Sequence, residues 1–140
     1  MRHHPLLVLQ TLLLLTACTG PGTRESATEP LADIVIEKKG STAGGDCAVS
    51  VLISNRMRGS DWDGASYHLS LLNRSGKHAG RLMGAPHRPI LSGRDLADSG
   101  RVTGVRCEDI GGAELVYLGY YPKGKAQQNM HIHRVRISVK

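Results

Sequence analysis

Residues 47–54 have the sequence Cys-Ala-Val-Ser-Val-Leu-Ile-Ser, in which apolar side chains alternate with small or polar ones. Successive side chains of a β-strand point to opposite faces, so this alternation places the odd-numbered residues from Cys47 to Ile53 on one face. An α-helix would instead need apolar residues three and four positions apart. The stretch therefore predicts a half-buried β-strand with one strongly apolar face.

The same alternation recurs along the chain on both sides of this stretch. It predicts further strands at residues 34–36, 67–71, 77–83, 102–107, 114–121 and 130–139. Between two of them, Asn73-Arg-Ser-Gly76 predicts a turn, with Gly76 supplying a positive φ. Residues 84–100 contain Pro86, Pro89, Gly93 and Gly100, which predicts a loop with at most a short edge strand. No segment shows helical spacing over three turns.

These strands predict an all-β fold, an antiparallel β-sandwich of about seven strands, over residues 31–140. The chain has 140 residues, of which 40% are hydrophobic, enough for one small core. Its formal net charge is +6, and the basic residues are dispersed along the sequence. Aromatic residues make up only 4%, which argues against a stacking surface for single-stranded nucleic acid.

Residues 1–17 have the features of a bacterial export signal. A short positive start precedes an apolar run at residues 6–15, which is too short to span a bilayer as a mature helix. The run ends in Leu15-Thr-Ala-Cys18, which resembles the lipobox of bacterial lipoproteins. That resemblance implies cleavage before Cys18 and a diacylglycerol on its thiol. The alternative is a plain secretory signal in which Cys18 has no role.

The residue after Cys18 is Thr19, and lipoproteins held in the inner membrane typically carry Asp there, so the resemblance implies the outer membrane. Residues 18–30 are mostly Thr, Gly, Pro, Ser and Glu, which predicts a flexible tether after the lipidated cysteine. Cys47 and Cys107 remain, and an even pair in an oxidising compartment predicts a disulfide, here one that links the two sheets. A catalytic thiol or a zinc site is the alternative, but neither a Cys-x-x-Cys pair nor four ligands are present.

A second resemblance covers roughly residues 46–116. Its features are Cys47 opening a strand, Asn55 closing it, Tyr-His-Leu-Ser-Leu-Leu-Asn-Arg-Ser-Gly at 67–76, Met83, and Cys-Glu-Asp-Ile at 107–110. This order resembles the IrmA-like exported bacterial proteins. The resemblance implies an immunoglobulin/fibronectin-III-like sandwich with one disulfide, a binding or host-interaction role, and a strand-exchanged homodimer as one form. The chain also resembles, in general features, the small outer-membrane lipoproteins that often act as pilotins or accessory subunits of secretion and pilus machines.

The candidate contact residue is Trp62, the one large aromatic residue in a predicted loop, flanked by Asp61 and Asp63. An exposed tryptophan there marks a surface that binds a partner. The alternative is that Trp62 folds inward as a cap on the core. Asp61 and Asp63 resemble the start of a calcium loop, but the further oxygen ligands are missing.

His131 and His133 are the candidate metal ligands, because alternate positions on a strand share one face. Two imidazoles do not complete a zinc site, so they are expected to be boundary residues of a half-buried strand. No Gly-x-Ser-x-Gly elbow, phosphate loop or Ser/His/Asp set occurs, so neither catalysis nor a cofactor is expected.

The sequence therefore predicts a non-catalytic protein-binding module, anchored in the outer membrane by its N-terminal lipid. An assembly or accessory factor of the pilotin type is the first hypothesis. The alternative is a surface-exposed adhesion or host-interaction module, and a third is an inhibitor or metal-handling protein. The expected partners are the membrane, through the lipid or its anionic headgroups, and an envelope or host protein; a homodimer is a further possibility, and nucleic acid is not expected.

Overall fold

The computed structural model describes residues 29–140, so the predictions for the signal segment, Cys18 and most of the tether lie outside the described residues. The described chain forms eight β-strands and two short 3-10 helices. In chain order they are β1 (Ala32–Ser41), β2 (Cys47–Asn55), β3 (Trp62–Asn73), β4 (His78–Gly84), β5 (Asp95–Val102), η1 (Cys107–Asp109), β6 (Ile110–Pro122), β7 (Gln128–Asn129), η2 (Ile132–Arg134) and β8 (Val135–Val139). No helix among them is long and apolar enough to cross a membrane.

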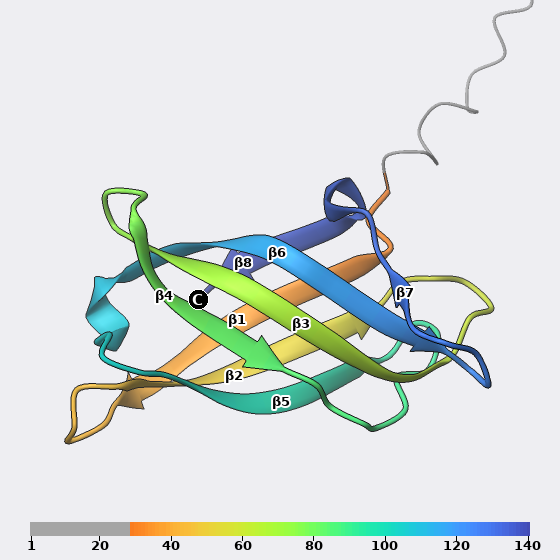
Figure 1. Ribbon diagram of the computed structural model, residues 1–140, viewed down its shortest axis with the longest axis horizontal. Coiled ribbons are helices and arrows are strands. Elements are labelled where there is room, and N and C mark those ends of the chain that lie inside the picture. Colours follow the sequence, from red (N-terminus) through yellow and green to blue (C-terminus); the bar gives the residue numbers. More distant parts are fainter. Residues whose placement is uncertain (1–28) are drawn as a thin grey trace, which may run out of the picture.

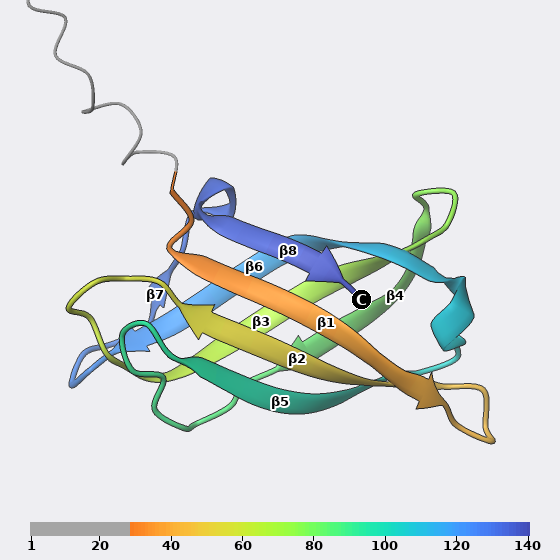
Figure 2. The same ribbon diagram turned by 180° about the vertical axis from the view of Figure 1, so that it is seen from behind.

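Two four-stranded sheets pack face to face as a β-sandwich (Figure 1, and from behind in Figure 2). Sheet A has the strand order β5-β2-β1-β8, and sheet B has the order β4-β3-β6-β7. Neighbouring strands are antiparallel except β1 and β8, which run parallel. The predicted all-β sandwich is confirmed, whereas the parallel pair was not expected.

The core lies between the two sheets, because each strand places alternate apolar side chains on its inner face. In β2 the apolar face predicted from the alternation is buried. Side chains of β1 and β3 are buried with it, among them Ile34, Ile36, Tyr67, Leu69 and Leu71. Burying one such side chain contributes roughly 1.5–3 kcal/mol, so this layer is the main source of stability.

The prediction for residues 84–107 is wrong in two places. Residues 84–100 were expected to form a loop with at most a short edge strand, but residues 95–102 form β5, which pairs along its whole length with β2 at the edge of sheet A. Residues 102–107, expected to be a strand, form the end of β5, a turn and the start of η1. The sequence of β5 is Asp-Leu-Ala-Asp-Ser-Gly-Arg-Val, and its pairing depends on backbone groups, so hydrophobic periodicity does not reveal it.

The last predicted strand is also shorter than expected. Residues 130–134 do not belong to a strand of sheet A, because β8 begins only at Val135. The chain first pairs with β6 as the two-residue β7 and then crosses to sheet A through η2. This change of sheet explains why one alternating stretch does not form one strand.

A partly buried polar contact joins the two sheets near the end of β4. The Tyr67 hydroxyl on β3 donates a hydrogen bond to Asp98 Oδ2 on β5, at 2.8 Å. Burial, together with the adjacent Asp98 carboxylate, raises the pKa of the Tyr67 phenol. Gly84 lies directly over this contact, because a Cβ there would be 2.6 Å from Asp98 Oδ2. A side chain at position 84 would therefore displace the bond between the sheets.

Candidate functional site

Trp62 lies in the core and not on an exposed loop tip. It is the first residue of β3, its side chain is 0% exposed, and its ring centroid lies 5.0 Å from that of Tyr120. Its backbone exchanges two hydrogen bonds with Ile90, at 3.0 and 2.9 Å. A buried indole cannot contact a partner, so the expected contact role of Trp62 gives way to the alternative, a cap on the core.

The two flanking carboxylates brace neighbouring segments against the start of β3. Asp61 Oδ1 accepts a hydrogen bond from the Ser92 N–H at 2.9 Å. Asp63 Oδ2 accepts one from the Gly124 N–H, also at 2.9 Å. These bonds tie the β4–β5 and β6–β7 connections to β3, which gives both residues a structural role.

His131 and His133 are both exposed, and they flank Ile132 in the segment that crosses between the sheets. Within residues 29–140, no group of three or more His, Cys, Asp or Glu side chains lies close enough to hold a metal ion. The expectation that these residues are on a strand is corrected, because the backbone here turns into η2.

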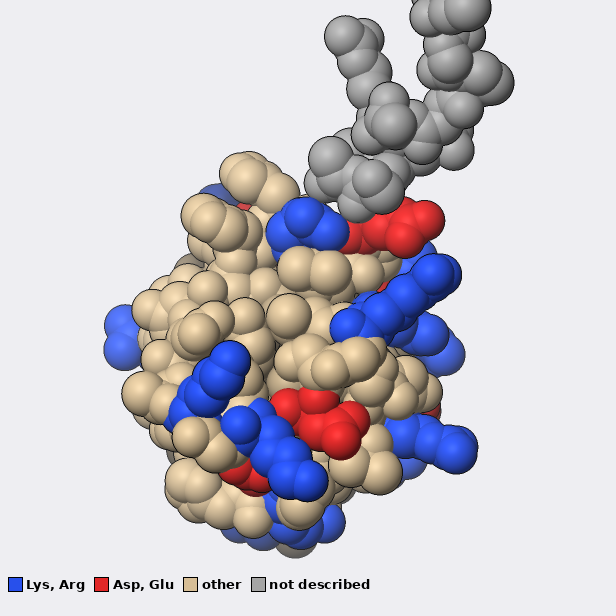
Figure 3. Space-filling model, turned by 90° about the vertical axis from the view of Figure 1, so that its right-hand side faces the viewer, with Lys and Arg blue, Asp and Glu red and all other residues tan. Residues whose placement is uncertain are grey.

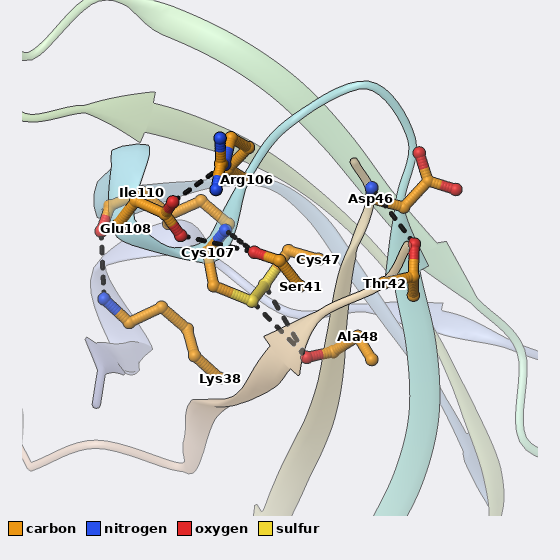
Figure 4. Close-up of a disulfide and its surroundings, with 10 residues drawn as sticks. All are labelled: Lys38, Ser41, Thr42, Asp46, Cys47, Ala48, Arg106, Cys107, Glu108 and Ile110. Carbon is orange, nitrogen blue, oxygen red and sulfur yellow. Dashed lines mark hydrogen bonds and ion pairs between the residues drawn. A yellow bond between two sulfur atoms is a disulfide. The ribbon is translucent and has the colours of Figure 1, made fainter. Parts of the chain in front are cut away.

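The predicted disulfide between Cys47 and Cys107 is present (Figure 4). Cys47 opens β2 in sheet A, whereas Cys107 lies in η1, directly before β6 of sheet B, and not on a strand. The Cys107 N–H donates a hydrogen bond to Ser41 Oγ at 3.0 Å, and Lys38 Nζ donates one to the Ile110 carbonyl at 3.2 Å. Together these contacts fasten one end of the sandwich.

At the opposite end, a buried carboxylate holds β8 on β1. Asp33 of β1 is 5% exposed and accepts hydrogen bonds from Arg136 of β8, at 2.9 and 3.1 Å, and from Arg56 at 2.8 Å.

Figure 3 shows the end of the sandwich where the described chain begins, with basic side chains spread over it and acidic ones between them. The charge here is therefore dispersed, as the sequence predicted.

A β-bulge in β6 turns two neighbouring side chains toward solvent. His68 pairs with Tyr117 and Leu69 pairs with Leu115, so Val116 has no opposite residue on β3. In a regular strand Leu115 and Leu118 would lie on opposite faces, since they are three residues apart. The extra residue lets both leucines enter the core, while Val116 and Tyr117 point outward.

Val116 and Tyr117 line one side of a surface hollow of ≈ 320 Å³. The other side is the segment from Asn129 to His133, which includes the buried Met130 and the exposed Ile132. Backbone bonds hold this segment in place: the Met130 N–H donates to the Leu118 carbonyl at 2.8 Å, and the Arg134 N–H donates to the His131 carbonyl at 2.9 Å. The hollow has an apolar floor and an imidazole rim, which suits an apolar side chain of a protein partner.

The sequence analysis did not predict this hollow. It placed Val116 and Ile132 in regular strands, in which every second side chain faces the core. The spacing of Leu115 and Leu118 within Leu-Val-Tyr-Leu was the available signal for a bulge.

Two solved structures are similar to this chain in fold, both with TM-scores below 0.5. IrmA from Escherichia coli is 14% identical with a TM-score of 0.48, and the match covers 76% of this chain and 92% of that one. A GH20 exo-β-N-acetylglucosaminidase from Vibrio harveyi is 10% identical with a TM-score of 0.42, over 77% of this chain and 18% of that one. No protein-family model and no curated protein matches the sequence. Neither structural likeness assigns an activity or a partner to this chain.

Proposed function

We propose that this protein is a lipid-anchored component of the outer membrane that binds another envelope protein, as an assembly or accessory factor of the pilotin type. The observation that supports binding is the grouping of exposed apolar side chains. Within residues 29–140, four large hydrophobic residues are exposed, and Val116 (49%) and Ile132 (53%) line the same hollow. Single exposed hydrophobic residues are ordinary, but adjacent ones beside a hollow mark a contact surface.

Binding at this hollow is non-covalent. An apolar side chain of the partner fills the space between Val116 and Ile132 and removes both from water. The Asn129 amide and the two imidazoles at the rim supply hydrogen bonds that fix its orientation. The lipid on Cys18 holds the domain near the membrane. Glu29 lies eleven residues after Cys18, and a chain of that length spans roughly 40 Å at most.

The first prediction concerns the hollow. A photoreactive amino acid at Asn129, on its rim, is expected to give a discrete crosslinked adduct in intact cells. Adding Ile132→Asp should reduce the adduct strongly, because loss of a central apolar contact costs about 2 kcal/mol, close to 30-fold in affinity. The matched control is Leu91→Asp, since Leu91 is 52% exposed but does not line the hollow. An adduct that survives Ile132→Asp at full strength would remove the hollow as the docking site.

The second prediction concerns the anchor. Cells fed a fatty-acid probe are expected to label the wild-type protein, and Cys18→Ala should abolish the label, because the lipobox cysteine supplies the only thiol outside the disulfide. Gel fluorescence after immunoprecipitation measures the amount of label on the protein. A Cys18→Ala variant that is still labelled contradicts the lipoprotein assignment, and it leaves the docking prediction intact.

A further inference from the structure

On the outer face of sheet B, two rows of side chains run across strands β4, β3 and β6. One row passes through His68 of β3, and the other through Ser70, the next outward residue of β3. In the first row, His68 of β3 pairs with Met83 of β4 and with Tyr117 of β6. Residues directly opposite in adjacent strands share a face, so all three point away from the core. Met83 is 66% exposed, the largest exposed fraction among the large hydrophobic residues of the described chain.

In the second row, Ser70 of β3 pairs with Arg81 of β4 and with Glu114 of β6. The row therefore has a positive end, a small neutral centre and a negative end. Within residues 29–140, neither Arg81 nor Glu114 takes part in an ion pair. Both side chains are exposed on the sheet face and free to meet an opposite charge from outside.

This pattern is complementary to itself. If a second copy is rotated by 180° about an axis along β3 and laid face to face, its β6 lies over the first copy's β4. Glu114 of each copy then faces Arg81 of the other, which forms two equivalent ion pairs. The same rotation places Tyr117 of each copy against Met83 of the other, an aromatic–thioether contact of the kind that stabilises interfaces.

Along the line of β3, the axis passes over one imidazole between two small residues. The outward residues are Ser66, His68 and Ser70, and His68 of each copy faces His68 of the other. Beside Ser66 on β6, the side chains of Gln127 and Tyr117 cover the outer side of Gly119. Tyr117 is held in place before contact, because its hydroxyl lies against Ser66 Oγ and accepts a hydrogen bond from Gln127 Nε2 at 2.7 Å. A side chain that is already fixed loses little conformational entropy on binding.

We propose that two copies of this chain form a two-fold symmetric dimer through the outer faces of their β4–β3–β6 strands. The pairing of Arg81 with Glu114 across the axis selects a second copy over an unrelated partner, since a single surface supplies both halves of each contact. The hollow beside Ile132 lies at the far edge of β6, so the dimer presents two hollows on opposite sides. The inference does not depend on the lipid anchor. It shares Tyr117 with the proposed docking site, because Tyr117 lines the hollow and also faces Met83 across the axis.

The test is the oligomeric state of the purified chain carrying Cys18→Ala, so that no lipid contributes to association. Sedimentation equilibrium over about 1–100 µM covers the range expected for a sheet-face dimer of modest apolar content. The wild-type face is expected to show a monomer–dimer equilibrium. Arg81→Glu and Glu114→Arg, which each create two like-charge contacts, should each weaken dimerisation at least tenfold, and Arg58→Glu in the β2–β3 loop should not.

The combined variant with Arg81→Glu and Glu114→Arg restores opposite charges across the axis, so it should recover most of the wild-type association. Circular dichroism of every variant checks that the sandwich is folded. A wild-type chain that is monomeric throughout the range overturns the proposal. A dimer that neither single reversal weakens also overturns it, and this is the result expected of a strand-exchanged dimer. A double variant that is folded but stays monomeric overturns it as well.

Discussion

Replacing Trp62 with alanine is expected to lower the free energy of unfolding by roughly 3–5 kcal/mol, the range for removal of a buried aromatic side chain. The side chain is 0% exposed and packs on Tyr120, so its loss leaves a cavity between the two sheets. The sheets cannot close this cavity easily, because the backbone of Trp62 is fixed by its two hydrogen bonds to Ile90. Chemical denaturation followed by far-UV circular dichroism measures the change. Tryptophan fluorescence cannot be used, because Trp62 is the only tryptophan in the sequence.

Trp62→Phe is the matched control. It keeps an aromatic ring against Tyr120 and removes the indole Nε1, which is buried without a hydrogen-bond partner in the described chain. A buried donor without a partner is itself unfavourable, so the phenylalanine variant should lose clearly less stability than the alanine variant. An alanine variant that unfolds at the wild-type denaturant concentration would contradict the core role of Trp62.

Alternating apolar residues predicted β2 and the central part of β3, residues 67–71, because each has one face in the core and one in water. The turn between β3 and β4 was also predictable, and its chemistry is local. Asn73 Oδ1 accepts hydrogen bonds from the N–H groups of Ser75 and Lys77, and Gly76 has a φ of +78°. Such features depend on the identity of a few adjacent residues, which the sequence states directly.

The features that were missed depend on partners far away in sequence. The edge strand β5 buries little of its own surface and exists because β2 offers it a row of backbone groups. Trp62 was placed in a loop because two carboxylates flank it, yet Asp63 and Trp62 simply occupy the outer and inner positions of a strand. The same applies to the hollow beside Val116, since its shape depends on a bulge and on the point where β7 leaves sheet B.

Removing the disulfide is expected to cost about 4 kcal/mol, because the bridge closes a span of 60 residues and so restricts the unfolded chain. For a domain of this size, that corresponds to a fall in melting temperature of roughly 15 °C. Cys47→Ala is preferable to serine here, since Cys47 is fully buried and a hydroxyl there would add a second penalty. Calorimetry of the variant, and of the wild-type protein with a reductant, should give similar melting temperatures.

The position of the bridge makes the expected effect local as well as global. Because Cys107 precedes β6 directly, loss of the bond frees η1 and the start of β6 from the start of β2. Amide exchange should therefore rise more at residues 103–112 than around Trp62 at the opposite end of β3. The hollow is formed by the distal half of β6, so partner capture through Ile132 should persist in the folded fraction. Equal exchange at both ends, or cysteines that react with a thiol probe in the oxidised native protein, would show that the bridge does not fasten this end of the sandwich.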